Sequence, residues 1–269
     1  MIKLKDIIKE SKFPSNQELY HYTSIVNAMS ILRSNEMKID KNKFLRDITL
    51  KQISVFSFSR SKIWMKYPAG VLASTRLECA IAVNAHLLST KYKIVSFNWY
   101  NRHQNNFSKS DENFEYEDRV VLQNKNLKNK TLKDINVNDP DYPNIPNFNR
   151  YVKYLMIKKN VLTDMSTDQF NSTFFSSFIN FDNYINIIKS QFPDPLILTK
   201  YVTSNITGKS MYDVYKSSDS TDIHINNLIW LTIIHGYIIY RLNNENLSKN
   251  ELFELEFKKM YPNIPLLFV

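Results

Sequence analysis

The chain has 269 residues, 43% of them hydrophobic and 23% charged, a composition that is ordinary for a globular protein of one large or two small domains. Its three isolated glycines, Gly70, Gly208 and Gly236, exclude the glycine-rich phosphate loops of P-loop and dinucleotide-binding folds. A single cysteine, Cys79, excludes an internal disulfide and a thiolate metal cluster, and such a residue is more often a small core residue than a nucleophile.

The net charge of +9 is unevenly distributed along the chain. Residues 1–162 carry 27 Lys and Arg against 15 Asp and Glu, whereas residues 163–269 carry 8 against 11. A basic segment favours polyanionic partners such as nucleic acid or a phosphorylated cofactor, although lysines spread over a solvated surface give the same charge. Because the predicted secondary structure also changes near this point, we predict two domains, 1–162 and 163–269.

In chain order, the first elements are a helix, a strand, a second helix and a second strand. Residues 1–11 predict a short helix and lack the apolar centre of a signal peptide. Residues 18–22 (ELYHY) predict a strand, after which Thr23 or Ser24 can cap a helix with apolar residues at helical spacing. The alternating and β-branched or aromatic residues 53–59 (ISVFSFS) predict the next strand.

The following segment, residues 69–88, allows two interpretations. We prefer a strand at Val71–Leu77 with a turn and a helix from Glu78 onward, and the alternative is one continuous helix. The later strands predicted in this half are at residues 92–100 (YKIVSFNWY), within residues 114–121 (FEYEDRVV) and at residues 150–161 (RYVKYLMIKKNV).

After residue 162 the pattern is mainly helical, with helices predicted at residues 180–191, 226–243 and 248–259. The most apolar stretch, residues 227–240, is only 14 residues long and contains a His-Gly pair. A membrane span needs about 20 apolar residues, so this stretch predicts a buried helix and we expect no membrane partner.

Most common catalytic patterns are missing. The five histidines have no short ligand spacing, which argues against a zinc site, and there is no G-x-S-x-G nucleophile elbow. Three stretches with candidate catalytic or binding residues remain. Their ordinary structural interpretations are, in chain order, a part-buried histidine, an edge strand with a solvated arginine, and a charged surface loop. Their candidate residues are His21, then Ser57, Ser59 and Arg60, and last Glu115 and Glu117.

Taken in this order, the stretches LYHYTS (19–24), SFSRS (57–61) and EDRV (117–120) resemble the ADP-ribosyltransferase superfamily. The likeness is to the branch in which H-Y-T-S opens the fold, as in toxin enzymes that modify DNA and related phage-borne proteins. With IPNFNRYVKYLMI (145–157) as a closing strand, it covers roughly residues 18–160. It implies an α+β fold, with a core of two small packed β-sheets and flanking helices, followed by a helical C-terminal region.

The resemblance also implies a function: a mono-ADP-ribosyltransferase that transfers ADP-ribose from NAD to a macromolecular acceptor, nucleic acid or protein. We expect it to act in the cytoplasm, which is that of the host if the protein is phage-encoded. Glu117 would stabilise the oxocarbenium-like transition state, and Glu115 would orient the acceptor. Arg60 would hold the pyrophosphate and His21 a ribose hydroxyl. The other residues assigned to NAD are Tyr22, Thr23, Ser57, Ser59, Trp64 and Tyr67.

Two alternatives differ in function. An RNA 2′-phosphotransferase on the same fold relies on additional histidines and arginines, and His86 and His103 lie in no matching context. A basic nucleic-acid-binding or host-inhibitor protein needs no catalysis, and the aromatic residues interleaved with lysine at residues 91–107 could stack on bases. The resemblance does not explain the lysine-rich insertion at 123–149 or the C-terminal third.

Overall fold

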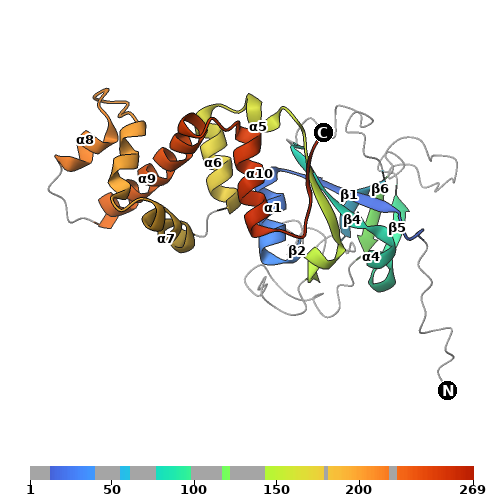
Figure 1. Cartoon of the computed structure of the whole chain (residues 1–269). Coiled ribbons are helices and arrows are strands. Elements are labelled where there is room, and N and C mark those ends of the chain that lie inside the picture. The colour runs from blue at the N-terminus through green and yellow to red at the C-terminus, as the bar shows by residue number, and fades with distance from the viewer. Residues whose placement is uncertain are drawn as a thin grey trace, which may run out of the picture. The chain divides into compact units, whose positions relative to one another are not determined.

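The computed structural model describes residues 13–39, 55–60, 77–97, 117–121, 143–178, 181–217 and 223–269, and over these residues the fold is α+β (Figure 1). The chain divides into two compact units. The first comprises the described residues up to Lys158 together with Ile264–Val269, and the second comprises Lys159–Asn263. The observed division lies close to the predicted boundary at residue 162. The final segment, however, belongs to the first unit and not to the helical region in which we placed it.

The first unit is built on a seven-stranded sheet of order β5-β6-β3-β1-β4-β8-β9. All neighbours in it are antiparallel except β8 and β9, which are parallel. A separate two-stranded sheet pairs β2 with β7. The two small sheets that we expected are therefore, within the described ranges, one large sheet and one short ribbon. The strands are β1 (Glu18–Thr23), β2 (Glu36–Lys38), β3 (Val55–Ser59), β4 (Cys79–Asn84), β5 (Lys93–Phe97), β6 (Glu117–Val121), β7 (Asn144–Pro146), β8 (Val152–Ile157) and β9 (Leu266–Phe268).

The helix after β1 begins where its sequence predicts. Helix α1 (Ile25–Ser34) is capped by Ser24, whose hydroxyl accepts a hydrogen bond from the Asn27 backbone N–H. It ends at Asn35, which adopts the left-handed conformation with φ 52°. Its buried side chains recur at helical spacing: Ile25, Ala28, Met29 and Leu32.

The preferred assignment around Cys79 is wrong. The chain forms a strand, β4, where we expected a turn and the start of a helix, and helix α4 (Ala85–Lys91) begins only after Asn84, which caps it. The predicted strand at Val71–Leu77 lies almost wholly outside the described residues. Strand β4 is central and buried on both faces, so its sequence CAIAVN is a continuous apolar run without alternation. Such a run cannot be distinguished from a buried helix by periodicity.

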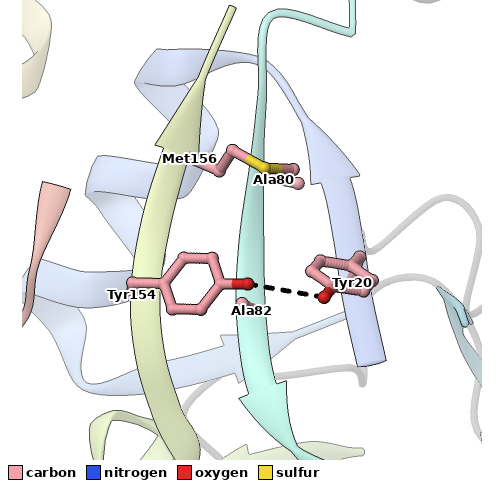
Figure 2. Close-up of a cluster of buried hydrophobic side chains, with 5 residues drawn as sticks. All are labelled: Tyr20, Ala80, Ala82, Tyr154 and Met156. Carbon is pink, nitrogen blue, oxygen red and sulfur yellow. Dashed lines mark hydrogen bonds between the residues drawn. The ribbon is translucent and has the colours of Figure 1, made fainter. Parts of the chain in front are cut away.

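Rows of paired residues cross β1, β4 and β8. Ala82 of β4 pairs with Tyr20 on one side and with Tyr154 on the other. Because alanine is small, the two tyrosine rings extend toward each other across β4, and their hydroxyl oxygens lie 3.4 Å apart (Figure 2). Ala80 and Met156 complete this buried cluster, and Tyr22 packs against it.

The second unit is helical, as predicted after residue 162. Its aromatic core includes Phe170, Phe174 and Phe178 of one helix, and the ring centroids of Phe178 and Phe253 lie 4.6 Å apart. The three helices predicted from periodicity are confirmed as α7, α9 and α10. The elements are α5 (Val161–Asp164), α6 (Thr167–Phe178), α7 (Phe181–Gln191), the 3-10 helix η5 (Pro195–Tyr201), α8 (Met211–Lys216), α9 (Ile223–Asn244) and α10 (Lys249–Met260).

Helix α9 contains the most apolar stretch of the chain, but it is not buried all round. Ile234 and Ile238 are almost fully buried, whereas Leu228 is 52% and Leu231 45% exposed. None of the helices in the described ranges is both long and apolar enough to span a bilayer. At Gly236 the helix lies so close to η5 that a Cβ atom would be 2.0 Å from the carbonyl oxygen of Leu198.

Candidate functional site

The three stretches that carry the resemblance lie on adjacent strands. Strand β3 is the neighbour of both β1 and β6. Tyr20 of β1 pairs with Ser59 of β3, and Ser59 pairs in turn with Glu117 of β6. At the usual strand spacing, the two ends of this row are about 10 Å apart. The fold thus brings Glu117 close to the strand that contains His21.

His21 is fixed against β3 by its own side chain. Its Nδ1 atom lies 3.0 Å from the backbone oxygen of Ser57, and its ring centroid is 5.5 Å from that of Phe58. A carbonyl oxygen can only accept a hydrogen bond, so Nδ1 carries the proton. In the neutral ring Nε2 is then the acceptor, which suits a hydroxyl-bearing ligand.

The predicted binding residues of β1 are divided between the two faces of the sheet. Successive side chains of a strand alternate, and paired residues of antiparallel strands share a face. Tyr20 and Tyr22 therefore lie on the face of Ser59. His21 lies on the opposite face, where its ring contacts Phe58. Alternation along the predicted strand already separates His21 from Tyr20 and Tyr22, but only the pairing with β3 shows that the tyrosines share the face of Ser59.

The hydroxyl and guanidinium groups predicted to bind NAD differ in accessibility. Ser57 and Arg60 are exposed, and Arg60 directly follows β3. Ser59 is only 2% exposed, so its hydroxyl belongs to the interior of the sheet face. Thr23 is half-buried at the end of β1, and its carbonyl oxygen accepts the backbone N–H of Glu78. Three further predicted residues, Glu115, Trp64 and Tyr67, lie outside the described residues.

A second polar cluster on the same sheet was not predicted. The Glu18 carboxylate accepts a hydrogen bond from the Lys153 ammonium at 2.6 Å and from the hydroxyls of Tyr20 at 2.5 Å and Tyr154 at 2.8 Å. Burial acts to raise the pKa of Glu18, but these three donors outweigh it and lower the pKa to about 2. Burial and the hydrogen bond to Glu18 together raise the pKa of Tyr20.

This Glu18 cluster joins β1 to β8 across β4, and it holds the strand that carries His21. Its charges are paired, the pKa of Glu18 is lowered and that of Tyr20 is raised, so neither Glu18 nor Tyr20 is suited to proton transfer near pH 7. A sequence signal was present only in part. Glu18 and Tyr20 are two residues apart on one strand and so share a face, but Lys153 and Tyr154 join them only through the strand order β1-β4-β8.

The single thiol of the chain does not suit nucleophilic chemistry in this sheet. Cys79 is fully buried and lies 3.4 Å from the Thr23 carbonyl oxygen, to which its thiol donates. Burial, with a smaller contribution from the Glu78 charge, raises the pKa of the thiol well above its usual value, which disfavours a nucleophilic thiolate. No group of three or more His, Cys, Asp or Glu side chains that could hold a metal ion occurs in the described part of the chain.

Comparison with protein-family models, with curated proteins and with solved structures found no match for this chain. The assignment of a function therefore depends on its own residues and on the way the strands bring them together.

Proposed function

We propose that the protein is a mono-ADP-ribosyltransferase that consumes NAD and transfers ADP-ribose to a nucleic acid or protein acceptor in the cytoplasm. The observation that carries the proposal is the adjacency of β1, β3 and β6. The strand with His21, the serine-rich strand and the strand that begins at Glu117 are neighbours, and Tyr20, Ser59 and Glu117 stand in one register row.

The reaction breaks the bond between nicotinamide and ribose. The bonding electron pair leaves with nicotinamide, positive charge develops on the ribose, and an acceptor nucleophile then forms the new bond at the same carbon. A fixed carboxylate near the ribose stabilises that charge more in the transition state than in the ground state. We assign this role to Glu117.

Arg60 suits another part of NAD, whereas the position of His21 limits its role. His21 has its Nδ1 proton committed to the Ser57 carbonyl, so Nε2 can accept a hydrogen bond from a hydroxyl. Its ring lies on the face opposite to that of Ser59, with which Glu117 pairs, so we do not assign His21 to the ribose at Glu117. Arg60 is exposed directly after β3, and a guanidinium can donate two parallel hydrogen bonds to a pyrophosphate without a glycine-rich loop.

Release of nicotinamide from NAD is the decisive assay. Glu117→Gln keeps the size of the side chain and removes its charge, so release should fall about 100-fold or more while NAD affinity stays nearly unchanged. Glu115→Gln is the matched control. If Glu115 only orients the acceptor, its variant should release nicotinamide normally and lose transfer to the acceptor.

Full activity of both variants would remove the two carboxylates from the mechanism. If the wild-type protein neither binds NAD nor releases nicotinamide in the presence of DNA, RNA or protein acceptors, the ADP-ribosyltransferase proposal is wrong. Binding of nucleic acid without NAD turnover would then favour the non-enzymatic basic protein.

A further inference from the structure

The helical unit contains a pocket of about 340 Å³ lined by α6 and α9. Four of its lining residues are apolar: Phe175, Leu231, Ile234 and Ile238. The remaining lining residues are polar and come mainly from the first two turns of α6: Asp168, Asn171 and Ser172, with His235 of α9. The volume is at the small end of the range for small-molecule sites, which is roughly 300–1,000 Å³.

Asn171 is an unusual residue for the interior face of a helix. It is only 8% exposed, and both its side-chain oxygen and its side-chain nitrogen are buried without a hydrogen-bond partner. Two nearby residues of the same helix, Phe170 and Phe174, are fully buried. A buried amide that makes no hydrogen bond lowers stability, so such a group is expected to have a partner in the functional state.

A second unsatisfied group lines the same pocket. The Nε2 atom of His235 is buried without a hydrogen-bond partner, and the nearest carboxylate oxygen, of Asp168, is 4.0 Å away, too far for a hydrogen bond. Burial lowers the pKa of His235 although Asp168 acts to raise it, so the ring is neutral at neutral pH. Two neutral hydrogen-bonding side chains thus line one small pocket.

We propose that this pocket binds the heterocyclic base of a nucleoside. An asparagine amide presents a donor beside an acceptor, and this arrangement is complementary to the edges of nucleobases. The apolar lining residues, among them the ring of Phe175, can cover a flat ring. Among the lining residues of the described chain there is no Lys or Arg, and Asp168 is 91% exposed at the rim. The negative charge of Asp168 disfavours a phosphate, so a nucleoside should bind better than its monophosphate.

The test is a calorimetric titration of the full chain with adenosine, guanosine, cytidine and uridine, and with the corresponding 5′-monophosphates. At least one nucleoside should bind saturably at one site, and its monophosphate should bind at least 10-fold more weakly. Asn171→Leu should abolish binding and raise the melting temperature, because an apolar side chain of similar shape removes the unsatisfied amide. Asn186→Leu, at an exposed position of α7, is the control and should bind like wild type.

If Asn171→Leu does not fold, Asn171→Asp is the second variant. It keeps the shape but exchanges the donor for a charge, and it should weaken the preferred nucleoside at least 10-fold. The proposal is overturned if no nucleoside binds, or if either Asn171 variant binds as tightly as wild type. If benzene, titrated in the same way, binds while no nucleoside does, the pocket is a packing cavity and the proposal is overturned. The pocket is independent of the proposed NAD site, so an excess of NAD should not displace the bound nucleoside.

Discussion

Removal of the Glu18 charge should destabilise the first unit, and the loss should depend on pH. Glu18→Gln keeps the size of the side chain but replaces a carboxylate that accepts hydrogen bonds from Lys153, Tyr20 and Tyr154. The folded protein holds the pKa of Glu18 at about 2, against an ordinary value of 4.5. This stabilisation is fully present above pH 4.5 and is lost as the pH falls toward 2.

The size of the effect follows from the two pKa values. Their difference corresponds to about 3 kcal/mol, at about 1.4 kcal/mol for each pH unit. The Glu18 side chain is 18% exposed and that of Lys153 is 36% exposed, so solvent screens part of the interaction. We expect Glu18→Gln to lower the free energy of unfolding by about 2 kcal/mol at pH 7.

Urea unfolding followed by circular dichroism at pH 7 and at pH 2.5 measures both the loss and its pH dependence. The control is Glu254→Gln, which breaks an exposed helical pair with Lys258 of the same 2.6 Å length. It should cost only about 0.3–0.5 kcal/mol at pH 7. The difference between wild type and Glu18→Gln should shrink at pH 2.5, where the wild-type carboxylate is partly protonated.

Equal losses for the Glu18 and Glu254 variants would refute the reasoning, because the three donors would then add nothing to an ordinary surface pair. A loss at Glu18 that stays constant between pH 7 and pH 2.5 would also contradict it, since the charge would not be its origin.

Three further predictions concern other parts of the fold. Gly236→Ala should destabilise the helical unit by about 3 kcal/mol in urea unfolding, because its Cβ would clash with the Leu198 backbone at 2.0 Å, and a loss below about 1 kcal/mol would contradict this. The Cys79 thiol should resist a thiol reagent in the native protein and react at once in urea, since it is fully buried, and fast native labelling would contradict that burial. Ser248→Ala should cost about 1 kcal/mol, because Ser248 and Glu251 form a capping box at the start of α10, and an unchanged melting temperature would count against it.

Local patterns were enough to predict many elements. Ser24 was one of two candidate caps for α1, and it is the residue that accepts the Asn27 N–H. The periodicity at 180–191, 226–243 and 248–259 placed three helices within a few residues of their observed ends. These predictions held because a helix cap and an amphipathic repeat depend on residues within a few positions of one another.

The stretches of the candidate site were also visible in the sequence, but their arrangement was not. LYHYTS, SFSRS and EDRV were recognised as a set, yet only strand order makes Tyr20, Ser59 and Glu117 one row. The Glu18 cluster gave only a partial signal and the pocket around Asn171 gave none, because each needs side chains from elements distant in sequence.

By itself the sequence determined the α+β class, the position of several strands and helices, and the residue types available for chemistry. Tertiary structure alone decided that CAIAVN is a central strand, that Leu266–Phe268 returns to pair with β8, and that His21 and Ser59 face opposite sides of the sheet. The physical reason is that strand pairing joins residues far apart in the chain. A strand buried on both faces loses the alternation that would identify it, and a shift of one residue in register would exchange the faces of His21 and its neighbours.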